Sequence, residues 1–115
     1  GTAYLKEHVV AAKEATVTEF LAQPKGTWCK VTGTIANLVN ETYGNFDLVG
    51  EDGASVYVYG LTSSFVAKND KSFASLGLKE GAYITLVGKR DSYNDQDQVG
   101  GPAYFLSEVV ITPAE

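Results

Sequence analysis

The chain has 115 residues, of which 44% are hydrophobic and 20% are charged, and its net charge is −5. This length and composition predict one globular domain that buries its own core without disulfides. The 14 acidic residues outnumber the 9 Lys and Arg, which argues against a broad basic surface for nucleic acid or an anionic membrane. No apolar run approaches the ~20 residues of a membrane-spanning helix, so we expect no integral membrane segment.

Groups that commonly carry catalysis are scarce. Cys29 is the only cysteine, so neither an internal disulfide nor a cysteine-based zinc cage can form. The only histidine, His8, lies in a separate N-terminal segment, and a lone cysteine in a strand is usually a small buried hydrophobe. The sequence also lacks a nucleophile elbow and a phosphate-cradling glycine loop. We therefore expect no enzyme, no cofactor and no metal site.

Residues 1–16 are predicted as an N-terminal arm, either helical or flexible, and residues 17–115 as the main domain. Apolar side chains in residues 2–14 follow a helix-like spacing. The sequence begins at Gly1 without Met, which fits an exported or envelope-anchored protein whose targeting segment has been removed. The sequence alone leaves the localisation open.

A short helix is predicted from Val17 to Ala22. Thr16 and Glu19 have the spacing of a capping box, which satisfies free N–H groups at the start of a helix. The helix should end before Pro24, because the residue that precedes a proline is pushed out of the helical conformation.

Three strands joined by two turns are predicted between Trp28 and Leu61. The polar clusters Asn40–Gly44 and Glu51–Gly53 mark the turns. Side chains alternate between the two faces of a strand, so one side of each strand can pack while the other contacts solvent. The residues predicted to face the core are Val31, Gly33, Ile35, Phe46, Leu48, Val56 and Val58. Trp28 is expected to pack in the core as well.

The second half of the chain predicts a helical turn at Ser72–Leu76, a fourth strand at Ala82–Lys89, a polar loop at Asp91–Pro102 and a fifth strand at Ala103–Thr112. A glycine inside a strand often marks a bend or a bulge. Gly33 is therefore expected to let one long strand serve two sheets, and Gly88 to act in the same way.

This pattern resembles the OB-fold. The resemblance covers about Val17 to Ile111 and rests on the segments Lys30–Ile35, Tyr43–Leu48, Val56–Leu61, Leu78–Gly81 and Leu86–Arg90. It implies an all-β, five-stranded Greek-key barrel with a short N-terminal helix and a helical turn between strands three and four. The chain is similar to small bacterial OB domains described as nucleic-acid-binding, including exported or lipid-anchored ones.

In OB-folds the ligand usually lies across strands two and three, between the loop that joins strands one and two and the loop that joins strands four and five. Exposed rings there offer flat surfaces to bases, and nearby cations follow the phosphates. Carried over to this chain, the resemblance implies an outer face of Tyr43, Asn45, Asp47, Tyr57 and Tyr59, with Lys30, Lys89, Arg90 and Tyr93 along its rim.

Simpler interpretations stay open at this stage. Tyr57 and Tyr59 are also explained as ordinary strand tyrosines that the N-terminal segment covers. Lys89 and Arg90, followed by Asp91, also fit a solvated strand end whose charges compensate each other.

Acidic side chains oppose the nucleic-acid interpretation. Asp47 would lie in the middle of the face, and Asp91, Asp95 and Asp97 would add negative charge beside it. The loop could also offer oxygen ligands to calcium, but its spacing lacks the EF-hand pattern, so a polar turn is the simpler interpretation.

The sequence thus favours a non-catalytic OB-fold binding module for single-stranded DNA or RNA. The alternative is a protein- or glycan-interaction module of the bacterial cell envelope, which the net charge of −5 favours. A third possibility is a structural subdomain whose face the N-terminal segment covers. The fold by itself does not decide among them.

Overall fold

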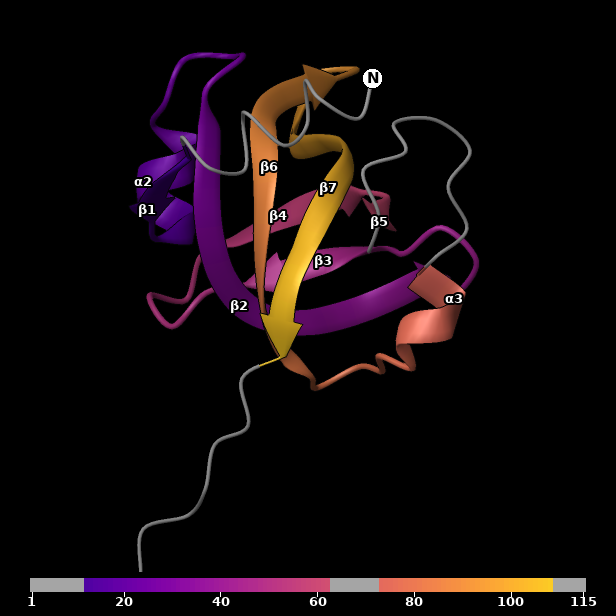
Figure 1. Ribbon diagram of the computed structural model, residues 1–115. Coiled ribbons are helices and arrows are strands. Elements are labelled where there is room, and N and C mark those ends of the chain that lie inside the picture. The colour runs from indigo at the N-terminus through magenta and orange to yellow at the C-terminus, as the bar shows by residue number, and fades with distance from the viewer. Residues whose placement is uncertain (1–11, 63–72, 109–115) are drawn as a thin grey trace, which may run out of the picture.

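The computed structural model describes residues 12–62 and 73–108, and these form an all-β structure (Figure 1). Its five main strands close into a barrel through four antiparallel pairs and one parallel pair, β4 with β7. The strands are β2 (Trp28–Asn40), β3 (Asn45–Val49), β4 (Ser55–Tyr59), β6 (Tyr83–Tyr93) and β7 (Gln96–Glu108). Around the barrel their order is β2, β3, β4, β7, β6, which is that of an OB-fold. The predicted fold class is confirmed.

Four short elements complete the described structure. β1 (Lys13–Ala15) pairs in parallel with β2, and β5 (Leu61–Thr62) pairs in parallel with β7. The helices α2 (Val17–Leu21) and α3 (Phe73–Leu76) lie on opposite sides of the barrel (Figure 1).

The short helix predicted after Thr16 is confirmed as α2, and the side chains of Thr16 and Glu19 cap it reciprocally. The helical turn predicted near Leu76 is confirmed as α3. The helix predicted over residues 2–14 is wrong for its last two residues. Lys13 and Glu14 belong to β1, because they pair with the edge of β2. Residues 1–11, including His8, lie outside the described part of the chain.

The long strand β2 serves two sheets. Its first half pairs with β6 and its second half with β3, and Thr34 takes part in both ladders. The strand turns from one direction to the other along its length (Figure 1). A Cβ atom added to Gly33 would lie only 2.8 Å from the carbonyl oxygen of Val49, so glycine is required where β2 crosses β3.

The core fills the barrel with the inward side chains that the alternation predicts. Val31, Ile35, Phe46, Leu48, Val56, Val58, Ile84 and Leu86 are all buried. Val17 and Phe20 of α2 are buried with them. Phe73 of α3 packs against Phe46, with ring centroids 6.2 Å apart.

The two residues at the start of β2 differ from each other. Cys29 is 3% exposed, and burial raises the pKa of its thiol, which disfavours the reactive thiolate. Trp28 is half-buried on the outer face of β2 opposite Lys89, so the expectation that it packs in the core is wrong. The alternation places Trp28 on the same face as Lys30, outside the barrel.

The predicted loop Asp91–Pro102 is instead a continuous hairpin. β6 extends to Tyr93 and β7 begins at Gln96, and they pair as far as Tyr93 with Gln96. The two residues between the strands, Asn94 and Asp95, both have positive φ, at 49° and 63°. A two-residue type I′ turn requires such angles, and Asn and Asp tolerate them better than most residues. The polar residues assigned to a loop therefore belong to the two arms and the turn of a hairpin, and Gln98 among them is buried.

Gly88 lies where the ladder between β6 and β7 shifts register, as expected of a strand glycine. Gly88 there opposes several residues of β7. The space that a side chain at Gly88 would need is occupied by Val99 and Ala103.

Asp52 holds α2 on the turn between β3 and β4. Its carboxylate accepts hydrogen bonds from the backbone N–H of Thr18 at 3.0 Å and of Ala54 at 3.1 Å. Hydrogen bonding from Thr18, by its side chain first and its backbone second, lowers the pKa of Asp52 below its usual value.

Gly33→Ala should lower the free energy of unfolding by about 1–3 kcal/mol, because the added methyl group overpacks the crossing of β2 and β3. Urea denaturation followed by circular dichroism measures the change. Ser55→Ala, at an exposed position of β4, should alter stability by less than about 0.5 kcal/mol. Equal stability of Gly33→Ala and the wild type would contradict the close packing at this crossing.

Asp52→Asn should make the protein less stable at neutral pH. Because the pKa of Asp52 is lower in the folded than in the unfolded state, its contribution is fully present above the usual aspartate pKa of about 4. The contribution is lost as the pH falls below that value and passes through the lowered folded-state pKa. Thermal midpoints from pH 7 to pH 2 should therefore converge for the two proteins. A difference that stays constant with pH would refute this role of the carboxylate.

Candidate nucleic-acid interface

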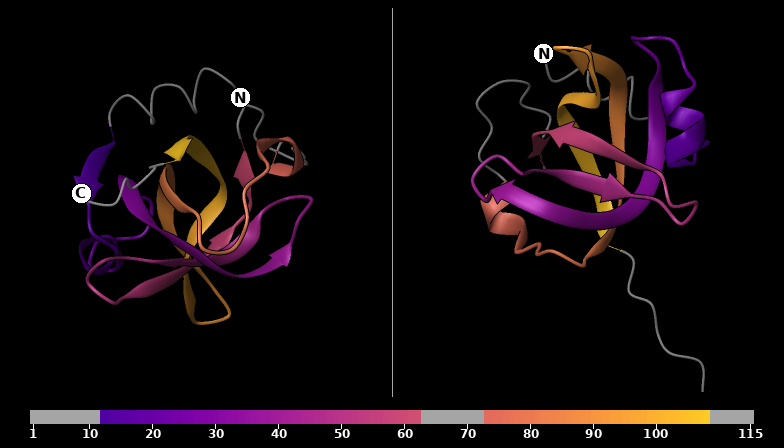
Figure 2. Two further views of the ribbon diagram at one scale, coloured as in Figure 1. Left: turned by 90° about the horizontal axis from the view of Figure 1, so that it is seen from below. Right: turned by 180° about the vertical axis from the view of Figure 1, so that it is seen from behind.

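The outer surface of β3 and β4 carries two tyrosines beside an amide and a carboxylate. Tyr59 lies directly opposite Asn45, and Tyr57 directly opposite Asp47. We call these four residues the tyrosine face. The view from behind looks onto the sheet that carries it (Figure 2, right). Three of the sequence-predicted site residues, Asn45, Tyr57 and Tyr59, are thus brought together.

The two tyrosines of this face differ in their environment. Asn45 Nδ2 donates a 2.9 Å hydrogen bond to the hydroxyl oxygen of Tyr57, which restrains that half-buried ring. Tyr59 is 57% exposed, so no other described residue covers its ring, and residues 1–11, which were a candidate cover, lie outside the described part of the chain. A planar ligand can therefore lie on Tyr59 next to a ring that is already held in place.

Asp47 is oriented by Asn37, a residue that the sequence analysis missed. Asn37 has a positive φ of 51° in the irregular part of β2, where the register with β3 shifts. Its Nδ2 donates to Asp47 Oδ2 at 2.9 Å, and its backbone N–H donates to Glu80 Oε1 at 3.0 Å. The only local signal was the tolerance of asparagine for this backbone conformation.

Tyr93 and Tyr43 belong to two segments that flank the tyrosine face, the β6–β7 hairpin and the turn after β2. Tyr93 is 68% exposed at the end of the β6–β7 hairpin, whose tip projects past the sheet of β3 and β4 (Figure 2, left). This hairpin borders the face because Gln98 of β7 pairs with Tyr57. Tyr43 is half-buried in the turn after β2, where its backbone N–H donates to Asn40 Oδ1 at 2.9 Å.

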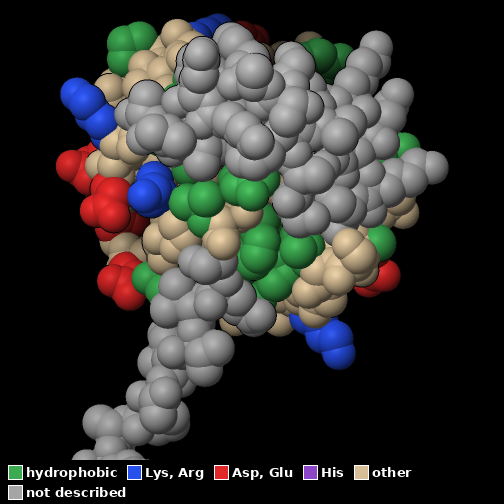
Figure 3. Space-filling view, in the orientation of Figure 1, with side chains coloured by type: hydrophobic (Ala, Val, Ile, Leu, Met, Phe, Trp, Pro, Cys, Tyr) green, Lys and Arg blue, Asp and Glu red, His purple; other side chains and the backbone are tan. Residues whose placement is uncertain are grey.

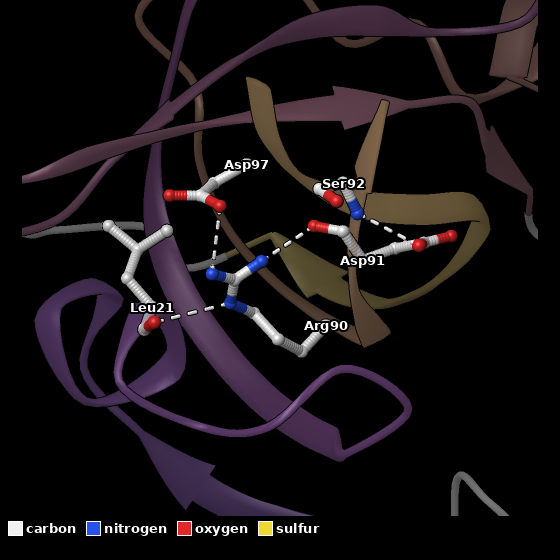
Figure 4. A network of polar contacts seen from close by, with 5 residues as sticks. All are labelled: Leu21, Arg90, Asp91, Ser92 and Asp97. Carbon is white, nitrogen blue, oxygen red and sulfur yellow. Dashed lines mark hydrogen bonds and ion pairs between the residues drawn. The ribbon is translucent and has the colours of Figure 1, made fainter. Parts of the chain in front are cut away.

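Arg90 does not lie free at the rim, because its side chain is engaged in holding the structure together (Figure 4). It is 8% exposed and donates to the Leu21 carbonyl oxygen at 3.2 Å, the Asp91 carbonyl oxygen at 2.6 Å and Asp97 Oδ1 at 2.9 Å. We call this network the Arg90 clamp. It ties the end of α2 to both arms of the hairpin, so the expected solvated strand end is wrong for Arg90.

The acidic partner of Arg90 is Asp97 and not the adjacent Asp91. Arg90 pairs with the buried Val99, so its side chain starts from the inward face of β6. The Asp91 carboxylate instead accepts from the backbone N–H of Ser92.

Lys30 lies away from the tyrosine face, in an open groove of about 520 Å³. Acidic and basic side chains gather on this side of the molecule, over β1 and the first half of β2 (Figure 3). Tyr83 donates to Glu51 Oε1 at 2.8 Å within the groove, and this hydrogen bond raises the pKa of Tyr83. The charged side chains that line the groove are Glu14, Glu19, Lys30, Glu51 and Asp52.

Lys89 is half-exposed on β6 and pairs with Gly100, two residues beyond Gln98 on β7. Residues 34–62, which include all of β3 and β4 and the second half of β2, contain no Lys or Arg. The cations expected along the rim are therefore reduced to Lys89, and the tyrosine face itself carries only the negative charge of Asp47.

Within residues 12–62 and 73–108, no group of three or more His, Cys, Asp or Glu could hold a metal ion. Along the hairpin, Asp91 and Asp97 lie on opposite faces of the paired strands, and Asp97 accepts a hydrogen bond from Arg90. The same part of the chain has no helix that is long and apolar enough to cross a membrane.

The barrel resembles solved structures, although no protein-family model and no curated protein matches the sequence. One similar structure is the hypothetical protein ygiW from E. coli, with 11% identity over 84% of this chain and 92% of that one, at a TM-score of 0.52. Another is a murine DNA-binding protein bound to double-stranded DNA, with 16% identity over 93% of this chain and a TM-score of 0.59. The match spans about half, 53%, of that murine chain. At these identities the likeness shows the fold alone.

Arg90→Met should lower the free energy of unfolding by about 1–3 kcal/mol, because the carbonyl groups of Leu21 and Asp91 lose their donor. Arg90→Lys should not restore stability, since an ammonium group lacks the planar fork that reaches three acceptors. Chemical denaturation measures both changes.

Asp97→Asn provides the comparison for this clamp. It should cost less than about 1 kcal/mol, because the Asp97 side chain is 56% exposed and water screens its pair with Arg90. If Arg90→Met lowered the free energy of unfolding by no more than Asp97→Asn does, the clamp would not hold α2 and the hairpin together.

Proposed function

We propose that this protein is a non-catalytic binding module whose tyrosine face takes single-stranded nucleic acid. The observation that carries the proposal is the open ring of Tyr59 beside the restrained ring of Tyr57, on the two strands that OB-folds use for ligands. Tyr93, on the projecting hairpin, adds a second exposed ring at the border of this face.

Single strands suit this surface better than a duplex. Stacking on a tyrosine needs an unpaired base with a free flat side, and each such contact contributes about 1–3 kcal/mol. Asn45 offers amide groups that can reach the edges of stacked bases. That a structural neighbour is a DNA-binding protein supports the ligand class, although that protein is bound to double-stranded DNA.

Electrostatics should contribute little to this binding. No Lys or Arg lies in residues 34–62, and Arg90 is occupied by the clamp. The logarithm of the affinity for single strands falls linearly with the logarithm of the salt concentration. The slope is proportional to the number of phosphates that the protein neutralises. Of the three cations that the resemblance implied for the rim, Lys89 remains, and with this one contact we expect a slope of log affinity against log salt no steeper than about −1.

Tyr57→Ala combined with Tyr59→Ala should weaken the binding of a labelled single-stranded oligonucleotide at least roughly tenfold, because two stacking surfaces are removed. Fluorescence anisotropy measures the affinity, and circular dichroism checks that the barrel is intact. Tyr83→Ala is the matched control, since Tyr83 lines the acidic groove on another surface. It should leave the affinity unchanged. Equal affinities of the double variant and the wild type would exclude the tyrosine face as the site.

The second candidate function is a protein- or glycan-interaction module of the bacterial cell envelope. The specific observation that favours it is that residues 34–62, which carry the tyrosine face, contain no Lys or Arg, since a neutral sugar needs aromatic stacking and amide or carboxylate partners but no cations. Titration with neutral oligosaccharides, with the same double variant, tests the glycan form of this candidate. Oligosaccharide binding without oligonucleotide binding would replace the first proposal by the second.

A further inference from the structure

We infer that Asp47 makes the tyrosine face selective for guanine among the unpaired bases. This inference rests on the proposed function, because it names which base that face prefers. It concerns the one feature that otherwise opposes nucleic-acid binding, a carboxylate in the middle of the surface.

The position of Asp47 is central and fixed. It lies directly opposite Tyr57 on β4 and Ala36 on β2, and two residues from Asn45 on its own strand. Asn37 Nδ2 holds Asp47 Oδ2 at 2.9 Å, and the backbone N–H of Asn37 is itself held by Glu80. A carboxylate restrained in this way loses little side-chain freedom when a ligand binds.

Asp47 keeps most of its capacity to accept hydrogen bonds. A carboxylate has about four acceptor positions, and the described residues use one of them, on Oδ2. Oδ1 accepts no hydrogen bond from the described residues, and the side chain is only partly buried. Two neighbouring donors of a ligand can therefore bind the two oxygens.

The chemistry of the bases selects guanine. An ionised carboxylate only accepts hydrogen bonds, so it favours a base edge with adjacent donors and disfavours an edge with acceptors. Guanine offers two adjacent donors on its Watson–Crick edge, N1–H and the N2 amino group. Adenine and cytosine place an acceptor next to their amino group, and thymine and uracil place carbonyl oxygens on both sides of N3–H.

Phosphate groups cannot take the same position. Two negative charges repel, and no Lys or Arg of residues 34–62 is present to compensate Asp47. A bound strand should therefore turn its bases toward β3 and β4 and its backbone away from them. This orientation is the one in which base edges, and not the backbone, decide affinity.

The test uses short thymidine oligomers that carry either no other base or one guanine at the centre. The wild type should bind the guanine oligomer roughly tenfold more tightly, as a bidentate contact to a base predicts. Replacing the guanine by hypoxanthine, which lacks the N2 amino group, should remove most of this preference. Replacing it by 7-deazaguanine, which keeps both Watson–Crick donors, should preserve it.

Asp47→Asn is the decisive variant, because it keeps the shape of the side chain and can still accept the hydrogen bond from Asn37. Its second position becomes an amide donor, so the guanine preference should disappear while the affinity for the all-thymidine oligomer stays equal or rises. Glu14→Gln is the matched control, as it removes one negative charge from the distant groove. It should leave the guanine preference intact.

The outcomes separate the inference from the proposed function. If the wild type binds every oligomer equally, or if Asp47→Asn keeps the guanine preference, nucleic-acid binding stands and the role of Asp47 is refuted. If the folded wild type binds no oligomer, the proposed function fails and the inference fails with it. Loss of the preference in Asp47→Asn but not in Glu14→Gln supports the inference.

Discussion

The close approach of β2 to β3 at Gly33 is the constraint on which the rest of the structure depends. One strand pairs with β6 along its first half and with β3 along its second half, and the barrel closes only because it does both. The carbonyl oxygen of Val49 occupies the space that a side chain at Gly33 would need. The chain solves the problem by omitting the side chain, as strands do where another backbone approaches closely.

This bend also divides the outside of the barrel into two surfaces of different chemistry. The outer face of β1, the first half of β2 and β6, together with α2 and the turn between β3 and β4, lines a groove with four carboxylates and Lys30. The outer face of β3 and β4 carries tyrosines, an asparagine and a single carboxylate. A polyanion should avoid the first surface because of its charge, whereas the second offers flat rings and hydrogen-bonding groups.

The Arg90 clamp links these surfaces through the hairpin. Arg90 holds the end of α2 and the arm of β7 at once, and the same hairpin carries Tyr93 at the end of β6. A guanidinium group suits this role because its planar fork serves several acceptors and stays charged when buried. One of the cations expected along the rim is therefore used to position the hairpin and is not free to contact a ligand.

The sequence by itself determined the features that arise from local rules. Alternation of side chains predicted the inward residues of β2, β3 and β4, and the capping box of Thr16 and Glu19 predicted α2, because both depend on residues a few positions apart. Alternation also put Tyr57 and Tyr59 on one face of their strand, whereas the resemblance to OB-folds implied that Asn45 shares this outer face. The short turn between the two strands fixes the register that brings them together. The predicted loop after Asp91 failed because a turn of Asn and Asp with positive φ can continue two polar strands as a hairpin.

Only the tertiary structure decided which charges meet. Lys89 and Arg90 are neighbours in the chain, yet one points outward and the other is buried against α2, which packs there from nearly seventy positions away. The pairing of Asn37 with Asp47 depends on a register shift between β2 and β3, and the isolation of Lys30 in the groove depends on how β1, α2 and β6 surround it. Strand periodicity decides which face a side chain occupies, but long-range packing and register decide what lies across from it, and the chemistry of a binding surface depends on both.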